Sequence, residues 1–173
     1  MAAEAARTEL LALARGDATK ARLCALVRAK GGAQWAAGVC DSAGHAALHF
    51  AAIGNAPRAV ETVLEMGINQ VDQRNLQGQT ALHLAAQRGS LRALRALITA
   101  GATLDAQDQE YQDTPLHKAA WEGRLACVEA LVEAGSSCDL LDSDGCTPLQ
   151  LAEINRQKHV MKYLSSLKLQ KET

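Results

Sequence analysis

Three histidines are the residues of this 173-residue chain whose type and spacing first suggest chemistry. His49, His83 and His117 recur every 34 residues in similar surroundings. Imidazole binds metals and transfers protons near neutral pH, so such a row suggests a zinc or catalytic site. Equivalent side chains on neighbouring packed helices would lie roughly 8–10 Å apart, too far to share one zinc ion at about 2 Å each. We therefore expect structural histidines and predict no metal site and no cofactor.

Other candidate chemical groups in the sequence have simpler explanations. Cys138, Cys146 and His159 have the spacing of no zinc finger. Asp142 and Asp144 are paired carboxylates in a stretch rich in turn-forming residues. The sequence has no glycine-rich phosphate loop, no GxSxG or HExxH motif, and no nucleophile beside an obvious base. We expect the protein not to be an enzyme.

Composition and charge limit the possible partners and location. The 18 Lys and Arg residues and 19 Asp and Glu residues give a net charge of −1, which offers no overall attraction to nucleic acid. No apolar run approaches the roughly 18 residues that span a membrane, and Glu4, Glu9 and Asp17 argue against a secretory signal. The five cysteines form no CxxC pair, which favours free thiols in a reducing compartment. We expect no nucleic-acid or membrane partner, and a location in the cytoplasm, the nucleus or both.

The elements that position the histidines belong to a repeat. Related seven-residue segments occur at 46–52, 80–86, 114–120 and 147–153. Their leucines follow one another at spacings of 34, 34 and 33 residues, a regularity typical of repeat proteins. The chain is 48% hydrophobic and only 3% aromatic, and its abundant alanine and leucine favour helices over strands.

Each repeat begins with the signals of a helix N-terminus. Thr80, Thr114 and Thr147 precede the segment and are predicted to cap the helix with their hydroxyl groups. Pro115 and Pro148 then stand at the first helical position, where a missing N–H costs little. The first full repeat has Ala46 in place of the threonine, so we expect the start of its helix to fray.

Each first helix is short and a second helix follows it. Gly89 and Gly123 end the first helix, since glycine tolerates the left-handed conformation of a helix end, and Asn55 stands at the matching place. The second helix carries apolar residues at helical spacing and closes at a glycine such as Gly101 or Gly135. A helix pair this small cannot bury its apolar face alone, so we predict a solenoid of stacked pairs.

The repeats resemble ankyrin repeats, with their period of about 33 residues and a T-P-L-H-x-A core, over about residues 8–165. The resemblance implies an all-α fold of stacked antiparallel helix pairs with short β-turn or hairpin loops, and a concave face formed by the turn tips and first helices. Residues 8–30 read as a degenerate leading pair, with a first helix at 8–14 and a second at 20–30. The predicted organisation is a tail at 1–7, an N-terminal capping repeat at 8–40, repeats at 41–74, 75–107 and 108–141, a C-terminal capping repeat at 142–168, and a polar tail at 169–173.

The third repeat departs from the pattern in two ways. Its turn has one extra residue near Tyr111, and Gln112 replaces the expected glycine, so we predict an irregular, protruding turn. Trp121 stands where the other repeats have Ile53, Gln87 and Glu153, so the position is not a uniform core site. Trp121 either faces the groove as the anchor of an interface or packs against the next repeat near Ile154.

The resemblance and the variable turn tips point to a non-catalytic protein-binding module. We expect a monomeric adaptor or scaffold that binds a protein on its concave groove and turn tips. The alternatives are a steric inhibitor of a kinase or transcription factor, and a structural or cytoskeletal spacer. Arg92 and Arg95 fall on the predicted outer face. The candidate binding residues are Arg74, Leu76, Gln77, Gln79, Arg88, Gln109, Glu110, Tyr111, Asp113, Lys118, Trp121 and Glu122.

Overall fold

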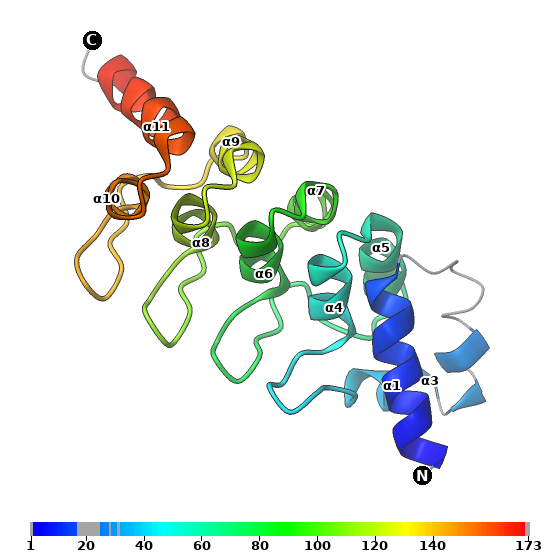
Figure 1. Ribbon diagram of the computed structural model, residues 1–173. Helices are drawn as coiled ribbons and strands as arrows, with labels where there is room; N and C mark the ends of the chain where they lie inside the picture. Colours follow the sequence, from blue (N-terminus) through cyan, green and yellow to red (C-terminus); the bar gives the residue numbers. More distant parts are fainter. Residues whose placement is uncertain (1, 17–24, 28, 31, 172–173) are drawn as a thin grey trace.

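Pairs of helices stack side by side along the molecule in the computed structural model, which describes residues 2–16, 25–27, 29–30 and 32–171 (Figure 1). Between the pairs, long turns project toward one side. These described residues contain no strand, and Cys40 and Ala46 form an isolated antiparallel bridge. The predicted all-α solenoid is therefore confirmed.

Within the described residues, the named helices form an inner row, an outer row and two N-terminal helices. The inner row consists of the first helices of the repeats: α4 (Ala47–Ile53), α6 (Ala81–Arg88), α8 (Pro115–Trp121) and α10 (Pro148–Ile154). The outer row consists of the second helices: α5 (Pro57–Glu65), α7 (Leu91–Thr99), α9 (Leu125–Glu133) and α11 (Lys158–Lys171). The N-terminal helices are α1 (Ala2–Arg15) and α3 (Gly32–Ala37).

One continuous core runs between the two rows. The repeated leucines Leu48, Leu82 and Leu116 are fully buried, and small alanines at the same helices let neighbouring axes approach closely. Each inner helix packs against the next inner helix, and α1 packs against α4 and α5 at the N-terminal end. The stacking buries apolar faces that no single pair could bury, which is the main source of stability in a solenoid.

The predicted caps form in two of the three repeats that have the threonine. The N–H groups of His117 and Gln150 donate to the hydroxyls of Thr114 and Thr147, at 3.4 and 3.3 Å. Thr80 makes no such bond, so that prediction is wrong for its repeat; its hydroxyl lies 2.9 Å from Nδ1 of His83 instead. The hydroxyl of Thr114 makes the same contact with His117, at 2.8 Å, in addition to its cap.

The first full repeat forms its helix without a threonine. Ala46 is fully buried, and its N–H donates to Nδ1 of His49 at 3.2 Å. The threonine repeats make the same bond to their histidines, so it does not replace the missing hydroxyl. The N–H of His49 donates instead to the backbone carbonyl of Ala46 at 3.0 Å. Helix α4 begins at Ala47, in register with the other repeats. Its first residues are buried and helical, and the structure shows no frayed end there.

The first helices end as the sequence predicts. Gly89 and Gly123 have φ angles of 74° and 69°, and Asn55 takes the same left-handed conformation at 52°. Arg156 is the equivalent residue in the last repeat and has a φ of 57°. Glycine relieves the strain of this conformation, and asparagine tolerates it better than arginine does.

Both ends of the chain are more helical than expected. Helix α1 begins at Ala2, well before Thr8, and α11 continues to Lys171, beyond residue 168. The segments expected as tails consist mainly of good helix formers, which extend the helices. The second helix expected at 20–30 lies largely outside the described residues.

Thiols and membrane spans can be assessed only over the described parts of the chain. Cys40, Cys127 and Cys146 carry free thiols. No helix among those parts is both long enough and apolar enough to cross a bilayer.

Candidate functional site

The three histidines of the repeated motif hold neighbouring repeats together through hydrogen bonds. Nε2 of His49 donates to the carbonyl of Gln79 at 3.1 Å, and Nε2 of His83 donates to the carbonyl of Asp113 at 3.0 Å. His117 makes the same bond to Cys146 at 3.1 Å. Each carbonyl belongs to the turn of the following repeat. The imidazoles are therefore fully engaged in holding turns, as the structural interpretation predicts.

Hydrogen bonds fix the tautomer of these rings, and burial sets their charge state. Nδ1 of His83 accepts the N–H of Thr80 at 3.1 Å, so the ring proton lies on Nε2. Burial lowers the pKa of His83 from 6.5 to about 4. Burial likewise lowers the pKa of His49 and His117. All three rings are neutral at physiological pH.

The turns have one common design, in which a side-chain carbonyl or carboxylate binds backbone N–H groups. Oδ1 of Asn75 accepts from the N–H groups of Gln77 and Gln79 at 3.0 and 2.9 Å. Oδ1 of Asp142 accepts from Asp144 and Cys146 at 2.9 and 2.8 Å. The turn closes four residues after the Asn or Asp, with a glycine in the left-handed conformation at the residue before closure.

The turn of the third repeat contains one extra residue, as predicted. The N–H of Asp108 donates to the carbonyl of Asp113, five residues later. Gln112 occupies the place of the usual glycine and has a φ of 55°. The longer loop carries Tyr111, whose side chain is half exposed.

Neighbouring turns are joined through their backbones. The N–H of Leu76 donates to Ala43 at 3.1 Å, and the N–H of Gln109 donates to Gln77 at 3.0 Å. The N–H of Ser143 donates to the carbonyl of Tyr111 at 2.7 Å. The turn tips therefore form one connected edge instead of independent loops.

Lys118 lies in a buried ion-pair cluster beneath this longer turn. Its Nζ is 2.9 Å from Oδ2 of Asp108 and 2.8 Å from Oδ2 of Asp113, and 5.5 Å from the centre of the Tyr111 ring. Only 11% of the lysine side chain is exposed. The equivalent positions in the other repeats hold Phe50, Leu84 and Leu151, so the two carboxylates compensate for a charge at an otherwise apolar position.

The pKa values of the three groups follow from burial and mutual attraction. Burial acts to lower the pKa of Lys118, but the two carboxylates outweigh it and raise that pKa above 10.5. Burial raises the pKa of Asp113, and Lys118 offsets this only in part. Burial also acts to raise the pKa of Asp108, yet Lys118 and backbone donors bring it below 3.8. A lysine held in its charged form is a poor general base, which indicates a structural ion pair.

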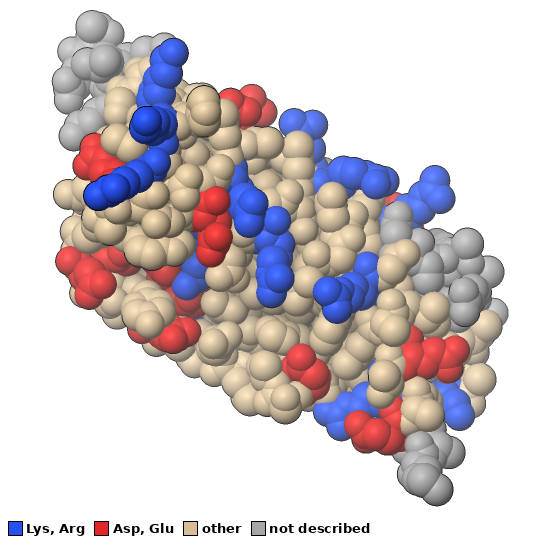
Figure 2. Space-filling view, in the orientation of Figure 1, with Lys and Arg blue, Asp and Glu red and all other residues tan. Residues whose placement is uncertain are grey.

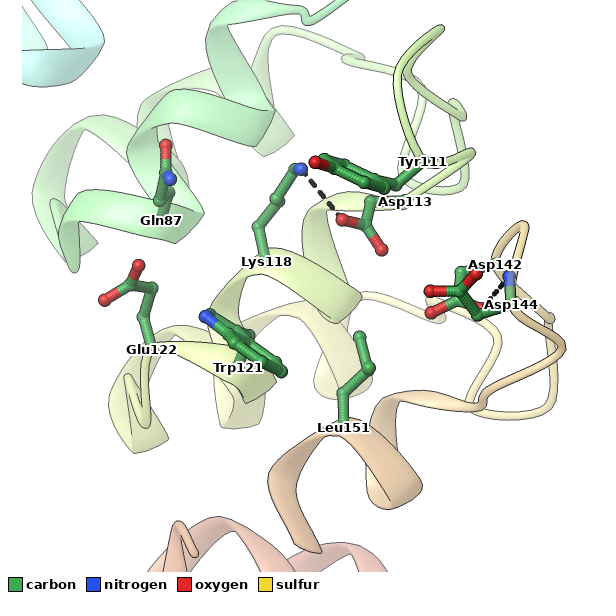
Figure 3. A pocket seen from close by; sticks show the side chains of 9 residues that line it. All are labelled: Gln87, Tyr111, Asp113, Lys118, Trp121, Glu122, Asp142, Asp144 and Leu151. Atoms are coloured by element: carbon green, nitrogen blue, oxygen red, sulfur yellow. Dashed lines mark hydrogen bonds and ion pairs between the residues drawn. The ribbon is translucent and has the colours of Figure 1, made fainter. Parts of the chain in front are cut away.

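Trp121 lines a cavity of about 430 Å³ on the face where the inner helices and turns meet (Figure 3). We call it the Trp121 pocket. Trp121 is 41% exposed, and its backbone carbonyl, not its ring, accepts hydrogen bonds from Asn155 and Gln157 of the next repeat, at 2.6 and 3.1 Å. Ile154 is itself 60% exposed. The pocket is lined by Gln87, Tyr111, Asp113, Lys118, Trp121, Glu122, Asp142, Asp144 and Leu151.

The remaining candidate binding residues differ in accessibility. Gln79 and Asp113 are buried; Gln79 supports the surface from beneath, whereas Asp113 lines the Trp121 pocket. Arg74 is exposed, but its guanidinium donates to the carbonyls of Gly78 and Gln107 and so helps to hold two turns. The exposed candidates also include Leu76, Gln77, Arg88, Gln109, Glu110, Tyr111 and Trp121, while Glu122 and Lys118 are partly buried.

Several residues of the pocket and of the ion-pair cluster are not among the binding residues predicted from the sequence. They are Asp108 in the cluster, and Gln87, Asp142, Asp144 and Leu151 in the pocket. One signal was available: a lysine at an apolar repeat position, next to a turn with two aspartates, implies a buried ion pair. The proximity of Asp144 to Trp121 depends on packing between repeats, which a linear sequence does not display.

Comparison with protein-family models gives two matches. A model described as ankyrin repeats in three copies matches residues 10–108, and one described as ankyrin repeats in many copies matches residues 97–152. No curated protein matched the chain. Domains of this type are generally protein–protein interaction modules and are typically non-catalytic.

Proposed function

Because the chain belongs to the ankyrin-repeat family, we propose that it is a non-catalytic adaptor that binds a protein partner along its concave groove and turn tips. The Trp121 pocket is the centre of this surface. The partner would extend from there over the turns of the second and third repeats, where Leu76 is 74% exposed.

The observation that carries this proposal is the pair of exposed aromatic side chains at one place. The chain has only one Phe, two Trp and two Tyr residues. Trp121 and Tyr111 both line the pocket and are 41% and 50% exposed. Large aromatic side chains are enriched at interfaces, where a few of them supply most of the binding energy.

The rigidity of the surface supports the same proposal. The turns are linked by backbone hydrogen bonds, and His83 and His117 hold them to the helices behind. A surface that is ordered before binding loses little conformational entropy when a partner docks. The geometry therefore favours recognition over a reaction that needs a closed cavity.

Quantitative capture of partners by two matched variants tests the proposal. The groove variant is Trp121→Ala with Tyr111→Ala. The control is Arg92→Ala with Arg95→Ala, two exposed side chains of the outer helix α7. Lys118 is left intact because its loss would disturb the ion-pair cluster.

We expect the groove variant to lose partners that the wild type captures, by at least about tenfold, while the control retains them. Circular dichroism establishes that both variants remain folded. Equal capture by the groove variant and the wild type would contradict the proposal.

A further inference from the structure

The Trp121 pocket has an acidic wall. Four of its nine lining side chains are carboxylates, and one is a lysine. Acidic side chains also gather along the margin where the turns of the last two repeats lie, whereas basic ones are scattered over the remainder of this face (Figure 2). The local charge is therefore negative although the whole chain has a net charge of only −1.

Lys118 neutralises only part of this charge. It contacts one oxygen each of Asp108 and Asp113. Asp113 is only 9% exposed, and its other oxygen, Oδ1, has no hydrogen-bond donor within the described parts of the chain. In Figure 3 this oxygen points toward the side of the pocket where Asp142 and Asp144 lie. A buried acceptor left without a donor is costly, so a donor that reaches it would be favoured.

Asp144 extends the acidic wall at the mouth of the pocket. It is exposed, and its backbone N–H donates to Oδ1 of Asp142 at 2.9 Å, which fixes the turn. The other walls are aromatic and apolar. Trp121 lies on the opposite side of the cavity from Asp144, and the buried side chain of Leu151 lies between these two residues. Carboxylates opposite an indole ring suit a cation with a long apolar stem.

We infer that the Trp121 pocket receives an arginine side chain from a basic segment of the protein partner, an inference that rests on the proposed function. The guanidinium stacks on Trp121 and donates to the carboxylates of Asp113 and Asp144, and its methylene stem packs on Leu151. A cavity of about 430 Å³ accommodates one such side chain.

Arginine fits this site better than lysine. A planar guanidinium stacks on an aromatic ring and presents several N–H donors at once, whereas an ammonium group is a compact and strongly hydrated charge. The pocket offers acceptors on two separate turns, which a fork of donors spans. Lys118 already provides the single ammonium that Asp113 pairs with on its other oxygen.

An NMR titration with three capped tripeptides tests the inference. The peptides are acetyl-Gly-Arg-Gly-amide, the same peptide with citrulline as the uncharged isostere, and the same peptide with lysine. The indole N–H of Trp121, assigned with the variant Trp121→Ala, and the amide of Asp144 report on the pocket. We expect saturable shifts of both signals with the arginine peptide, weaker binding of the lysine peptide, and no saturable shifts with citrulline.

Two charge variants distinguish the pocket from general attraction to an acidic surface. Asp144→Asn keeps the backbone N–H that fixes the turn, and we expect it to weaken arginine binding by about threefold. Glu61→Gln removes one charge from the exposed face of α5 and is expected to change nothing. Equal effects of both variants, equal binding of arginine and citrulline, or equal binding of arginine and lysine would overturn the inference.

The peptide titration and the partner-capture experiment can fail independently of each other. If the groove variant loses its protein partners while the arginine peptide fails to bind, the adaptor function stands and the arginine inference falls. If the arginine peptide binds at Trp121 while capture is equal for all variants, the pocket stands and the adaptor proposal falls.

Discussion

Lys118 illustrates at the residue scale how a candidate binding group can have a structural role. Its charge, its place on the groove side and its position beside Trp121 made it a candidate for partner binding. The structure buries the ammonium between Asp108 and Asp113, close to the ring of Tyr111. Its contribution to recognition is therefore indirect, because it shapes the wall of the pocket from within.

We predict that Lys118→Met lowers the free energy of unfolding by about 3 kcal/mol, because two carboxylates would lose their buried counter-charge. The variant that also carries Asp108→Asn and Asp113→Asn should recover most of this loss. Urea unfolding followed by circular dichroism measures both. A loss below about 1 kcal/mol for the single variant would show that the ion pairs are not important for stability.

His83 gives a prediction about pH. Burial lowers the pKa of His83 from 6.5 to about 4, so between these values the unfolded chain binds a proton that the folded chain does not. Its stabilising contribution is complete above about pH 6.5 and is lost as the pH falls toward 4, by about 3 kcal/mol in total.

The last repeat supplies the control for this pH effect. Gln150 stands at the histidine position, and its Oε1 accepts the N–H of Thr147 at 2.8 Å without titrating. We therefore expect His83→Gln to show a smaller fall in stability between pH 6.5 and 4 than the wild type does. Urea unfolding at both pH values provides the comparison, and identical slopes would contradict the neutral, buried histidine.

At the scale of the element, the longer turn of the third repeat is the feature that makes this solenoid irregular. The hydrogen bond that closes this turn joins Asp108 to Asp113, five residues later. The longer turn places Tyr111 beside the pocket, and the two aspartates lie beneath the turn, where they contact Lys118. Gln112 accepts a left-handed φ of 55° at the position where Gly44, Gly78 and Gly145 stand in the other turns. Repeat geometry and local conformational preference therefore conflict at this one residue.

We predict that Gln112→Gly raises the free energy of unfolding by about 0.5–1 kcal/mol, because glycine adopts this φ without steric cost. The opposite change in a regular turn, Gly78→Ala, should be destabilising. A Cβ atom there would come within 2.8 Å of the backbone nitrogen of Gln109. Thermal unfolding of the two variants measures the contrast, and a destabilised Gln112→Gly would contradict the assigned strain.

For the whole molecule, the repeat spacing was sufficient to predict the stacked helix pairs, their register and the ends of most helices. The spacing of Leu48, Leu82 and Leu116 sets which residues are buried, and the structure buries all three. The extra turn residue and Gln112 were also predictable, because the other repeats give a standard for comparison. Helix extension at both ends depended on terminal residues that lie outside the repeat pattern.

The pocket could be predicted only in part. Trp121 and Tyr111 stood out by type, but Asp144 and Leu151 come from the following repeat and meet them only when the repeats stack. Gln79 and Asp113 varied between repeats like surface residues, yet both are buried and their carbonyls bind histidines of the preceding repeats. Variation between repeats therefore does not distinguish exposed residues from residues that pack between neighbouring turns.

The most direct test of the account compares binding and stability for Trp121→Ala alone. We predict that the dissociation constant for the partner captured by the wild type rises by an amount equivalent to about 2 kcal/mol, while the free energy of unfolding changes by less than about 1 kcal/mol. An unchanged dissociation constant together with a large loss of stability would place Trp121 in the packing between repeats and contradict the binding surface.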